Sequence, residues 1–378
     1  MIRKDSLMSI ITGGSRTVYY GPNASRYASE KTLSSGTPVT ALSKEEYKIY
    51  SESGNATSET WIFIEWTDGT KRRRGYVKSD WISVSESIKP VNPYANALTG
   101  ARWGINVGTT HTLYCGPDSN STSTNTQYAE AGSISAKEQV TFLGDKVNGW
   151  AFIEYNLAGS GLLKRAYINA NNLAANISAV SVASPGIRYT EGQFLPGYGP
   201  YGGTVVNQGF DDDKTIHKGH LGFDLNVPGN FVKPLFEGTF VDCGPTNGNG
   251  NVVVIKHIVH GETFYTTYSH MASYERYPID QKVFPTTIIG IEGNTGGVRK
   301  HLHISLYTGR SQTNPYGYCA SDKVTPFSQA VKQGGSTKGY YYGPNDPPYP
   351  RCGGVRFYDP YRVYTSGAAI ITAMKDLA

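Results

Sequence analysis

Short runs of β-branched and aromatic residues, separated by Gly, Asn, Asp and Ser, recur along most of the chain. Examples are ETWIFIEW at 59–66, NVVVIKHIV at 251–259 and HLHISLY at 301–307. Runs of this kind between turn residues are typical of strands in antiparallel sheets, so the pattern predicts a mainly β protein. One segment, AAIITAMKDLA at 368–378, is helix-like. No run of about 18 apolar residues occurs, so we expect no membrane-spanning segment.

The first half of the chain contains an internal repeat. TVYYGPN at 17–23 and TLYCGPD at 112–118 each precede a tryptophan-containing apolar run and then a second aromatic run, at similar spacings. This shared order predicts two copies of one small, strongly bent β-barrel, at residues 1–88 and 101–175. The segment between them is rich in Pro and Asn and is interpreted as a linker.

The repeats resemble bacterial Src-homology-3-like cell-wall modules. The residues that carry the resemblance are Tyr19, Gly21, Pro22, Trp61, Gly75, Tyr76 and Val77, with Tyr114, Gly116, Pro117, Trp150, Ala166, Tyr167 and Ile168 in the second copy. The second copy departs at Ala166, where glycine is usual. We expect the two tryptophans to be core residues. For Tyr19, Tyr20 and Tyr114, beside the Gly-Pro turns, packing and ligand stacking remain equally open.

The composition fits a protein that acts outside the cell. Charged residues make up 17% of the chain, which also holds 44 Gly and 28 Tyr and has a formal net charge of +5. Such values are typical of turn-rich β proteins rather than helical cytosolic enzymes. The mild positive charge suits an anionic polymer and equally an ordinary basic surface. The single basic run, KRRRG at 71–75, lies within a predicted strand and is interpreted as an exposed edge of the barrel, so we expect no nucleic-acid binding.

The N-terminus, MIRKDSLMSIITGG, lacks the apolar core and cleavage site of a secretory signal. We therefore expect release by lysis or on a phage particle, unless the chain has been trimmed. The four cysteines are Cys115, Cys243, Cys319 and Cys352. They are too few for a disulfide scaffold, and without a C-x-x-C pair a thiolate zinc site is not expected. Cys319 and Cys352 flank a Gly/Pro/Tyr-rich stretch, and we hypothesise that they pair.

Histidine is concentrated in one part of the chain, because seven of the 8 histidines lie between residues 217 and 303. In an extended segment, His220 and Asp224 point to one face, and so do His301 and His303. A nitrogen-rich site with one carboxylate suits Zn²⁺, and three protein ligands with one water form the catalytic arrangement. The cluster therefore predicts metal or acid–base chemistry.

Three motifs in this region resemble those of the lysostaphin/LytM-type zinc endopeptidases. They are HLGFD at 220–224, T-x-Y-S-H at 266–270 and HLH at 301–303. The resemblance implies an antiparallel β-sheet peptidase domain at residues 195–378. It departs from the family in a long insertion at 309–353.

The resemblance also implies roles for five residues. His220, Asp224 and His303 would hold one Zn²⁺ per chain, whereas His270 and His301 would serve as general base and acid without binding the metal. His257 is interpreted as structural or as a support for the site, and His217 and His260 as loop and turn residues. The insertion tyrosines, Tyr316, Tyr318, Tyr340, Tyr341 and Tyr342, are expected either to contact substrate or to form a packed cap.

The leading hypothesis is a monomeric zinc endopeptidase of the endolysin type that hydrolyses stem or cross-bridge peptides of peptidoglycan. Its N-terminal modules would target it to the bacterial wall. The alternative is a phage tail-tip or wall-binding structural protein with a degenerate or auxiliary peptidase domain. A zinc carboxypeptidase or amidase acting on the same polymer is a third interpretation, because the same chemistry serves any amide. Neither the bond cut, the wall type nor the ligand of the modules follows from the sequence.

Overall fold

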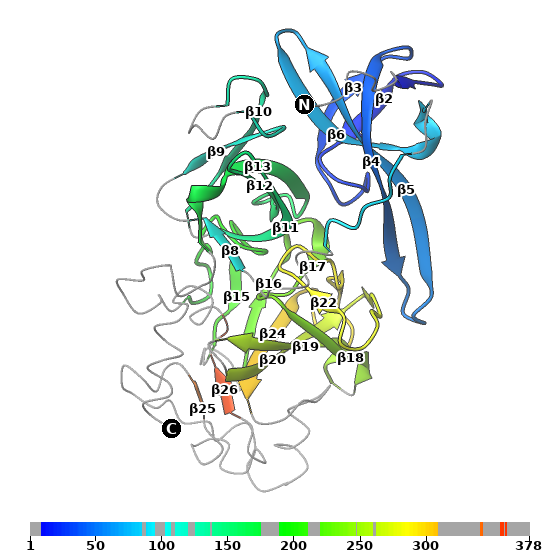
Figure 1. The fold of residues 1–378 in the computed structure, drawn as a ribbon. Coiled ribbons are helices and arrows are strands. Elements are labelled where there is room, and N and C mark those ends of the chain that lie inside the picture. Colours follow the sequence, from blue (N-terminus) through cyan, green and yellow to red (C-terminus); the bar gives the residue numbers. More distant parts are fainter. Residues whose placement is uncertain are drawn as a thin grey trace, which may run out of the picture. The chain divides into compact units, whose positions relative to one another are not determined.

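The computed structural model describes residues 9–84, 88–94, 103–106, 110–119, 125–136, 138–174, 189–210, 220–246, 248–259, 262–308, 341–342, 356–358 and 360. Strands in antiparallel sheets dominate these residues, which confirms the predicted mainly β fold class. No helix among them is long and apolar enough to cross a membrane. The elements group into two compact units (Figure 1). The N-terminal unit comprises residues 1–49, 56–157 and 162–176, and the C-terminal unit comprises 50–55, 158–161 and 177–378.

Two sheets with the same strand order build the N-terminal unit. The first has the order β3-β2-β6-β5-β4-β1-β7, and the second has β10-β9-β13-β12-β11-β8-β14. The strands of the first are β1 (Ser9–Ile11), β2 (Arg16–Tyr19), β3 (Ser29–Leu33), β4 (Pro38–Tyr50), β5 (Ala56–Asp68), β6 (Lys71–Lys78) and β7 (Ile82–Ser83), with a 3-10 turn η1 (Ser79–Trp81). Those of the second are β8 (Trp103–Asn106), β9 (His111–Tyr114), β10 (Glu130–Ile134), β11 (Gln139–Val147), β12 (Trp150–Asn156), β13 (Leu163–Asn169) and β14 (Leu173–Ala174), with a 3-10 turn η2 (Ala170–Asn172).

Most aromatic residues of the repeat serve packing. Trp61 and Trp150 are buried, and so are Tyr20 and Tyr114. Tyr19 is half-buried and packs edge-on against Trp61, with ring centroids 5.9 Å apart. The glycine of each Tyr-x-Gly-Pro turn is needed because a tyrosine ring lies directly on it. A Cβ atom would meet Tyr27 at 2.0 Å in the first repeat and Tyr128 at 2.2 Å in the second; the glycines are Gly21 and Gly116.

An arginine–glutamate pair occupies the same place in both repeats. Arg74 lies opposite Glu65 in the β5–β6 pair, and Arg165 lies opposite Glu154 in the β12–β13 pair. Each guanidinium donates to its cross-strand carboxylate and to a tyrosine hydroxyl of the other repeat, Tyr167 for the first and Tyr76 for the second. The two sheets are therefore joined by two related polar networks.

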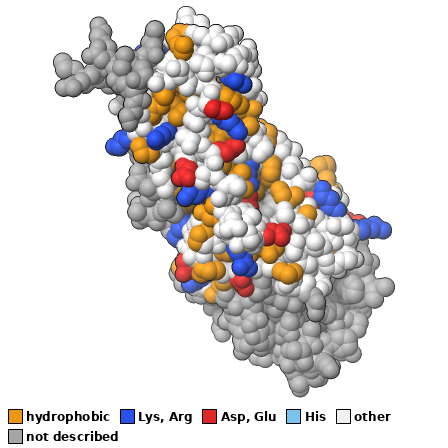
Figure 2. Space-filling view, turned by 90° about the vertical axis from the view of Figure 1, so that its right-hand side faces the viewer, with side chains coloured by type: hydrophobic (Ala, Val, Ile, Leu, Met, Phe, Trp, Pro, Cys, Tyr) orange, Lys and Arg blue, Asp and Glu red, His pale blue; other side chains and the backbone are white. Residues whose placement is uncertain are grey.

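The basic run at residues 71–75 is used inside the N-terminal unit. Arg73 pairs with Glu30 and Asp68, and Arg72 lies 3.6 Å from Glu65. On the face shown in Figure 2, the Lys and Arg side chains lie among Asp, Glu and hydrophobic side chains rather than in one patch. The charges of this run are thus largely compensated locally.

The C-terminal unit is built on one large sheet. Its main path among the described residues is β15-β16-β24-β20-β19-β18-β22, and a smaller sheet has the order β17-β23-β21. The strands are β15 (Val206–Gln208), β16 (Phe223–Leu225), β17 (Phe231–Val232), β18 (Gly238–Thr246), β19 (Gly250–Val259), β20 (Glu262–Met271), β21 (Ser273–Tyr274), β22 (Lys282–Val283), β23 (Gly290–Ile291) and β24 (Leu302–Thr308), with a 3-10 turn η4 (Pro228–Asn230). Alternate apolar residues of β24 and the continuous apolar run at 252–255 of β19 form its core.

Two short strands lie beyond the long central ones. β25 (Tyr341–Tyr342) pairs with β26 (Arg356–Tyr358), and β26 pairs with the second half of β24. A piece of the predicted insertion at 309–353 therefore returns to the main sheet. The rest of that insertion, including Cys319 and Cys352, and the helix predicted at 368–378 lie outside the described residues.

Candidate metal centre and its histidines

His220, Asp224 and His303 converge on the neighbouring strands β16 and β24 of the large sheet. Asp224 on β16 lies directly opposite His303 on β24, and His220 precedes β16 by three residues. Asp224 Oδ1 lies 2.8 Å from His303 Nδ1 and 3.2 Å from His220 Nε2, and these two nitrogens are 3.0 Å apart. The i,i+4 and cross-strand relationships thus bring one atom of each residue to a common point.

The hydrogen bond made by Nδ1 of His220 determines whether its other ring nitrogen, Nε2, has a free lone pair. Nδ1 donates to the carbonyl oxygen of Gly209 at 2.9 Å. Because a carbonyl can only accept, Nδ1 carries the proton, and Nε2 of the neutral ring presents a lone pair toward Asp224. A position-specific carbonyl contact of this kind has no sequence signal, so reasoning from the motifs missed Gly209.

The electrostatics of the cluster favour an ionised Asp224 carboxylate beside a neutral His303 imidazole. Burial alone would raise the pKa of Asp224, but His220 and His303 outweigh it and hold that pKa well below its usual range. Burial lowers the pKa of His303 to about 4. A carboxylate and two neutral nitrogen donors are the forms in which these residues bind a metal ion.

Close packing holds the His303 ring in place. A Cβ atom on Gly222 would lie 2.5 Å from Cε1 and Nε2 of that ring, and 2.5 Å from the Ile304 carbonyl oxygen. The glycine of HLGFD is therefore required by close approach, not by its backbone angles. Ser305, two residues further along β24, is within 2.9 Å of His303 Nε2.

His270 and His301 lie beside this cluster. Their ring centroids are 4.8 Å apart, and the His270 ring is 6.1 Å from that of His303. His301 Nε2 lies 3.6 Å from Asp224 Oδ2. Nδ1 of His270 donates to Thr295 O, and Nδ1 of His301 donates to Arg299 O, so each neutral ring presents an Nε2 lone pair. Burial lowers the pKa of His270, which favours its neutral form.

The position of His270 depends on a bulge in β20. Between Tyr268 and Met271, β20 holds one residue more than the facing segment of β19, and His270 has a positive φ of 63°. A bulge with a left-handed residue re-aims a side chain. His270 therefore joins the histidine cluster from a strand end where regular alternation would turn it away.

The other histidines are separate from the cluster or lie outside the described residues. His257 is fully buried, donates from Nδ1 to Glu237 O and accepts at Nε2 from Thr266 Oγ1 at 2.7 Å. Burial lowers its pKa to about 4. It is a satisfied core histidine, whereas His217 and His260 are not described.

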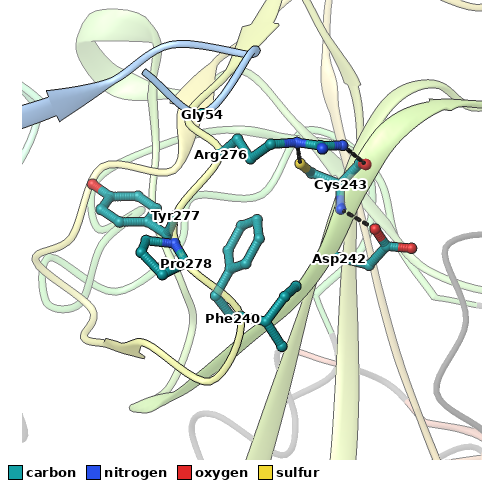
Figure 3. Close-up of a pocket in the computed structure, with 8 residues that line it drawn as sticks. Gly54, Phe240, Asp242, Cys243, Arg276, Tyr277 and Pro278 are labelled. Carbon is teal, nitrogen blue, oxygen red and sulfur yellow. Dashed lines mark hydrogen bonds between the residues drawn. The ribbon is translucent and has the colours of Figure 1, made fainter. Parts of the chain in front are cut away.

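A further pocket of the C-terminal unit lies along β18, which β19 and β20 separate from β24 in the sheet (Figure 3). None of the five residues of the histidine cluster lines it. Arg276 donates from Nε to Cys243 Sγ at 3.3 Å and from Nη2 to the Cys243 carbonyl at 3.2 Å. Burial raises the pKa of the Cys243 thiol, so it is not an activated nucleophile. Cys115 is likewise buried and free of a disulfide.

The donor set fits a catalytic metal ion. Two neutral imidazole nitrogens and one carboxylate oxygen face one point, and Zn²⁺ takes three such ligands with a fourth position for water. The side chains of these three residues are between 10% and 14% exposed, so solvent reaches the site. The two further imidazoles beside this set, those of His270 and His301, are suited to proton transfer, an arrangement that fits a metal-dependent hydrolase.

Residues 218–315 match peptidase family M23, and this part of the chain is an M23 peptidase domain. The members of that family are zinc metallopeptidases that hydrolyse peptidoglycan in the cell wall. None of the curated proteins compared with this sequence matches it significantly.

Several solved structures are similar to parts of this chain. LytU is 24% identical over 30% of this chain and 79% of its own, with a TM-score of 0.26. The catalytic domain of a mutant of EnpA, a prophage-encoded M23 protein from Enterococcus faecalis, is 23% identical over 31% of this chain and 88% of its own, with a TM-score of 0.26. A zinc-containing peptidase from Vibrio cholerae is 14% identical over 72% of this chain and 83% of its own, with a TM-score of 0.24.

Proposed function

We propose that this chain is a zinc-dependent endopeptidase that hydrolyses peptide bonds within peptidoglycan, with its N-terminal unit associating with the wall. The observation that supports the proposal is the convergence of His220, Asp224 and His303, with the rings of His270 and His301 beside them. Degenerate proteins of this type would lack some of these groups, whereas all five are present here.

His220 Nε2, His303 Nδ1 and Asp224 Oδ1 would hold the metal ion. When bound, Zn²⁺ supplies a water molecule of lowered pKa and polarises the scissile carbonyl. The buried Asp224 carboxylate contributes the negative charge of the site. The hydrogen bond from His220 Nδ1 to Gly209 O fixes the orientation of the ring, so that Nε2 points toward the metal position.

His301 and His270 would move protons. Each presents Nε2 as a base, because its Nδ1 proton is held by a backbone carbonyl. His301 Nε2 lies 3.6 Å from Asp224 Oδ2 and can take a proton from water; once that proton is passed to Nε2 of the adjacent His270, it can be delivered to the leaving amine. The pairing of two imidazoles at 4.8 Å allows one ring to act as base while the other acts as acid.

The wall-binding role of the N-terminal unit rests on the resemblance of its repeats to Src-homology-3-like modules. Because the repeated tyrosines are largely buried, we propose that the ligand contacts surface loops of these modules rather than Tyr20 or Tyr114. A second attachment point would raise the local concentration of the peptidase on an insoluble polymer.

The decisive experiment is digestion of purified peptidoglycans that differ in cross-bridge chemistry, with mass spectrometry of the products. An endopeptidase creates new amino termini inside stem or bridge peptides, whereas an amidase would release whole stem peptides from the glycan. His301→Ala and Asp224→Ala should both lose activity, but only Asp224→Ala should lose zinc. His111→Ala, in the N-terminal unit, is the matched histidine control. Absence of new termini from every wall tested would overturn the proposal, as would full turnover by Asp224→Ala.

A further inference from the structure

In each of the four histidines of the site, one ring nitrogen points away from the cluster, and the hydrogen-bond partner of that nitrogen differs among them. His220, His270 and His301 each donate to a backbone carbonyl, of Gly209, Thr295 and Arg299. His303 alone faces a side chain, because its Nε2 lies 2.9 Å from Ser305 Oγ. A carbonyl can only accept a hydrogen bond, but a hydroxyl can accept or donate.

We propose that Ser305 is a positioning residue that sets the tautomer and the ring orientation of His303 for metal binding. The inference rests on the proposed metal site. With a metal ion at Nδ1, the ring proton must sit on Nε2, where it is donated to Ser305 Oγ. In protein stripped of metal by a chelator, Nδ1 can keep the proton for Asp224 Oδ1 at 2.8 Å, while Ser305 turns its hydroxyl to donate to Nε2.

The surroundings make this hydroxyl difficult to replace. Ser305 is fully buried, and His303 is 8% exposed. Gly222 closes the same edge of the ring, since a Cβ atom there would lie 2.5 Å from Nε2. In so enclosed a place, water is a poor substitute for the lost hydroxyl, and His303 Nε2 would lose its hydrogen bond to Ser305.

The test compares Ser305→Ala with the unaltered full-length chain. Zinc affinity is measured by competition with a chromophoric chelator, and the geometry of the site by the visible absorption of Co²⁺ bound in place of zinc. Loss of an outer hydrogen bond to a ligand histidine typically weakens metal binding about 10–100-fold. We expect a loss in that range and a changed Co²⁺ spectrum. Ser305→Cys has a side chain of similar size that is a weaker acceptor, so its zinc affinity should lie between those of the unaltered chain and Ser305→Ala. It tests the inference if the alanine variant fails to fold.

Two controls separate positioning from a general effect of losing a buried hydroxyl. Thr266→Val removes the hydroxyl that bonds His257, a core histidine, and should lower stability without changing zinc affinity. Ser269→Ala removes a fully buried hydroxyl on β20 that makes no hydrogen bond and lies opposite His303. As a control, it too should leave zinc affinity unchanged. Zinc affinity in Ser305→Ala within threefold of the unaltered chain, or equal losses in Thr266→Val, would overturn the inference. Failure of the unaltered chain to bind zinc would instead overturn the proposed function.

Discussion

Replacing Arg165 by methionine is expected to destabilise the N-terminal unit much more than the same replacement of Arg74. The two arginines occupy equivalent places in the repeat, each opposite a glutamate on the neighbouring strand. Their surroundings differ, however. Arg165 bonds Glu45 as well as Glu154, and its side chain is 0% exposed, whereas the side chain of Arg74 is 17% exposed.

The magnitude follows from what each change leaves behind. Without Arg165, the carboxylates of Glu45 and Glu154 remain 5% and 1% exposed with no cation between them, and breaking such a buried pair costs about 3–5 kcal/mol. Without Arg74, Glu65 keeps Arg72 at 3.6 Å and the hydroxyl of Tyr128, so a loss of about 1–2 kcal/mol is expected.

Tryptophan fluorescence is a selective assay for this unit, because all five tryptophans of the chain lie between residues 61 and 150. At a urea slope of about 2 kcal/mol per M, a loss of 4 kcal/mol lowers the unfolding midpoint by about 2 M. Burial already raises the pKa of Glu45, with Arg165 opposing it. In Arg165→Met, the Glu45 carboxylate should take up a proton, so the loss of stability should shrink as the pH falls toward 4.5. Equal midpoint shifts for the two variants would refute this reasoning.

Three further changes test the C-terminal unit. Glu237 is 5% exposed and its carboxylate accepts no hydrogen bond; burial, opposed by Lys282, raises its pKa from 4.5 to about 7. Folding therefore takes up a proton between these two pH values, so the free energy of unfolding should fall by about 3 kcal/mol as the pH rises through them. In Glu237→Gln, calorimetry should find this pH-dependent loss abolished. Gly222→Ala should weaken zinc binding by roughly tenfold or more, measured by chelator competition, because the new Cβ displaces the His303 ring. His270→Gly and His270→Ala should both lose activity, but the glycine variant should be about 1 kcal/mol more stable in urea, because glycine adopts a positive φ without strain; equal stability would contradict a strained His270.

The strands and the fold class were accessible from local pattern. Runs such as 59–66 and 251–259 alternate or concentrate apolar residues between turn formers, and each lies in a strand of the structure. What local pattern could not supply is the partner of each polar side chain. The i,i+4 spacing of His220 and Asp224 and the i,i+2 spacing of His301 and His303 each indicated a shared face. They did not indicate the cross-strand pairing of Asp224 with His303, which is a long-range contact.

The charged residues illustrate the same limit. The basic run at 71–75 was interpreted as an exposed edge, yet Arg73 and Arg74 are mostly buried in ion pairs with Glu30 and Glu65. Periodicity assigns a face to a residue, but a guanidinium can be buried on any face where carboxylates and hydroxyls converge. Arg165 is the extreme case, because its partners Glu45 and Glu154 come from different repeats.

His270 belongs to a sequence motif that places it in the site, whereas the alternation of side chains along its strand would place it on the opposite face of the sheet. Ser269 lies opposite His303, and residues opposite each other share a face, so regular alternation would turn His270 to the other side of the sheet. The extra residue in β20 and the left-handed backbone reverse that outcome. The backbone N–H of His270 donates to Asn249 O and its ring Nδ1 donates to Thr295 O, and these two hydrogen bonds hold the strained conformation. Strain of this kind persists only where the surroundings enforce it, and here they bring the His270 imidazole beside His301 and His303. Among the described histidines, the one with a left-handed backbone is thus one of the two to which we assign proton transfer.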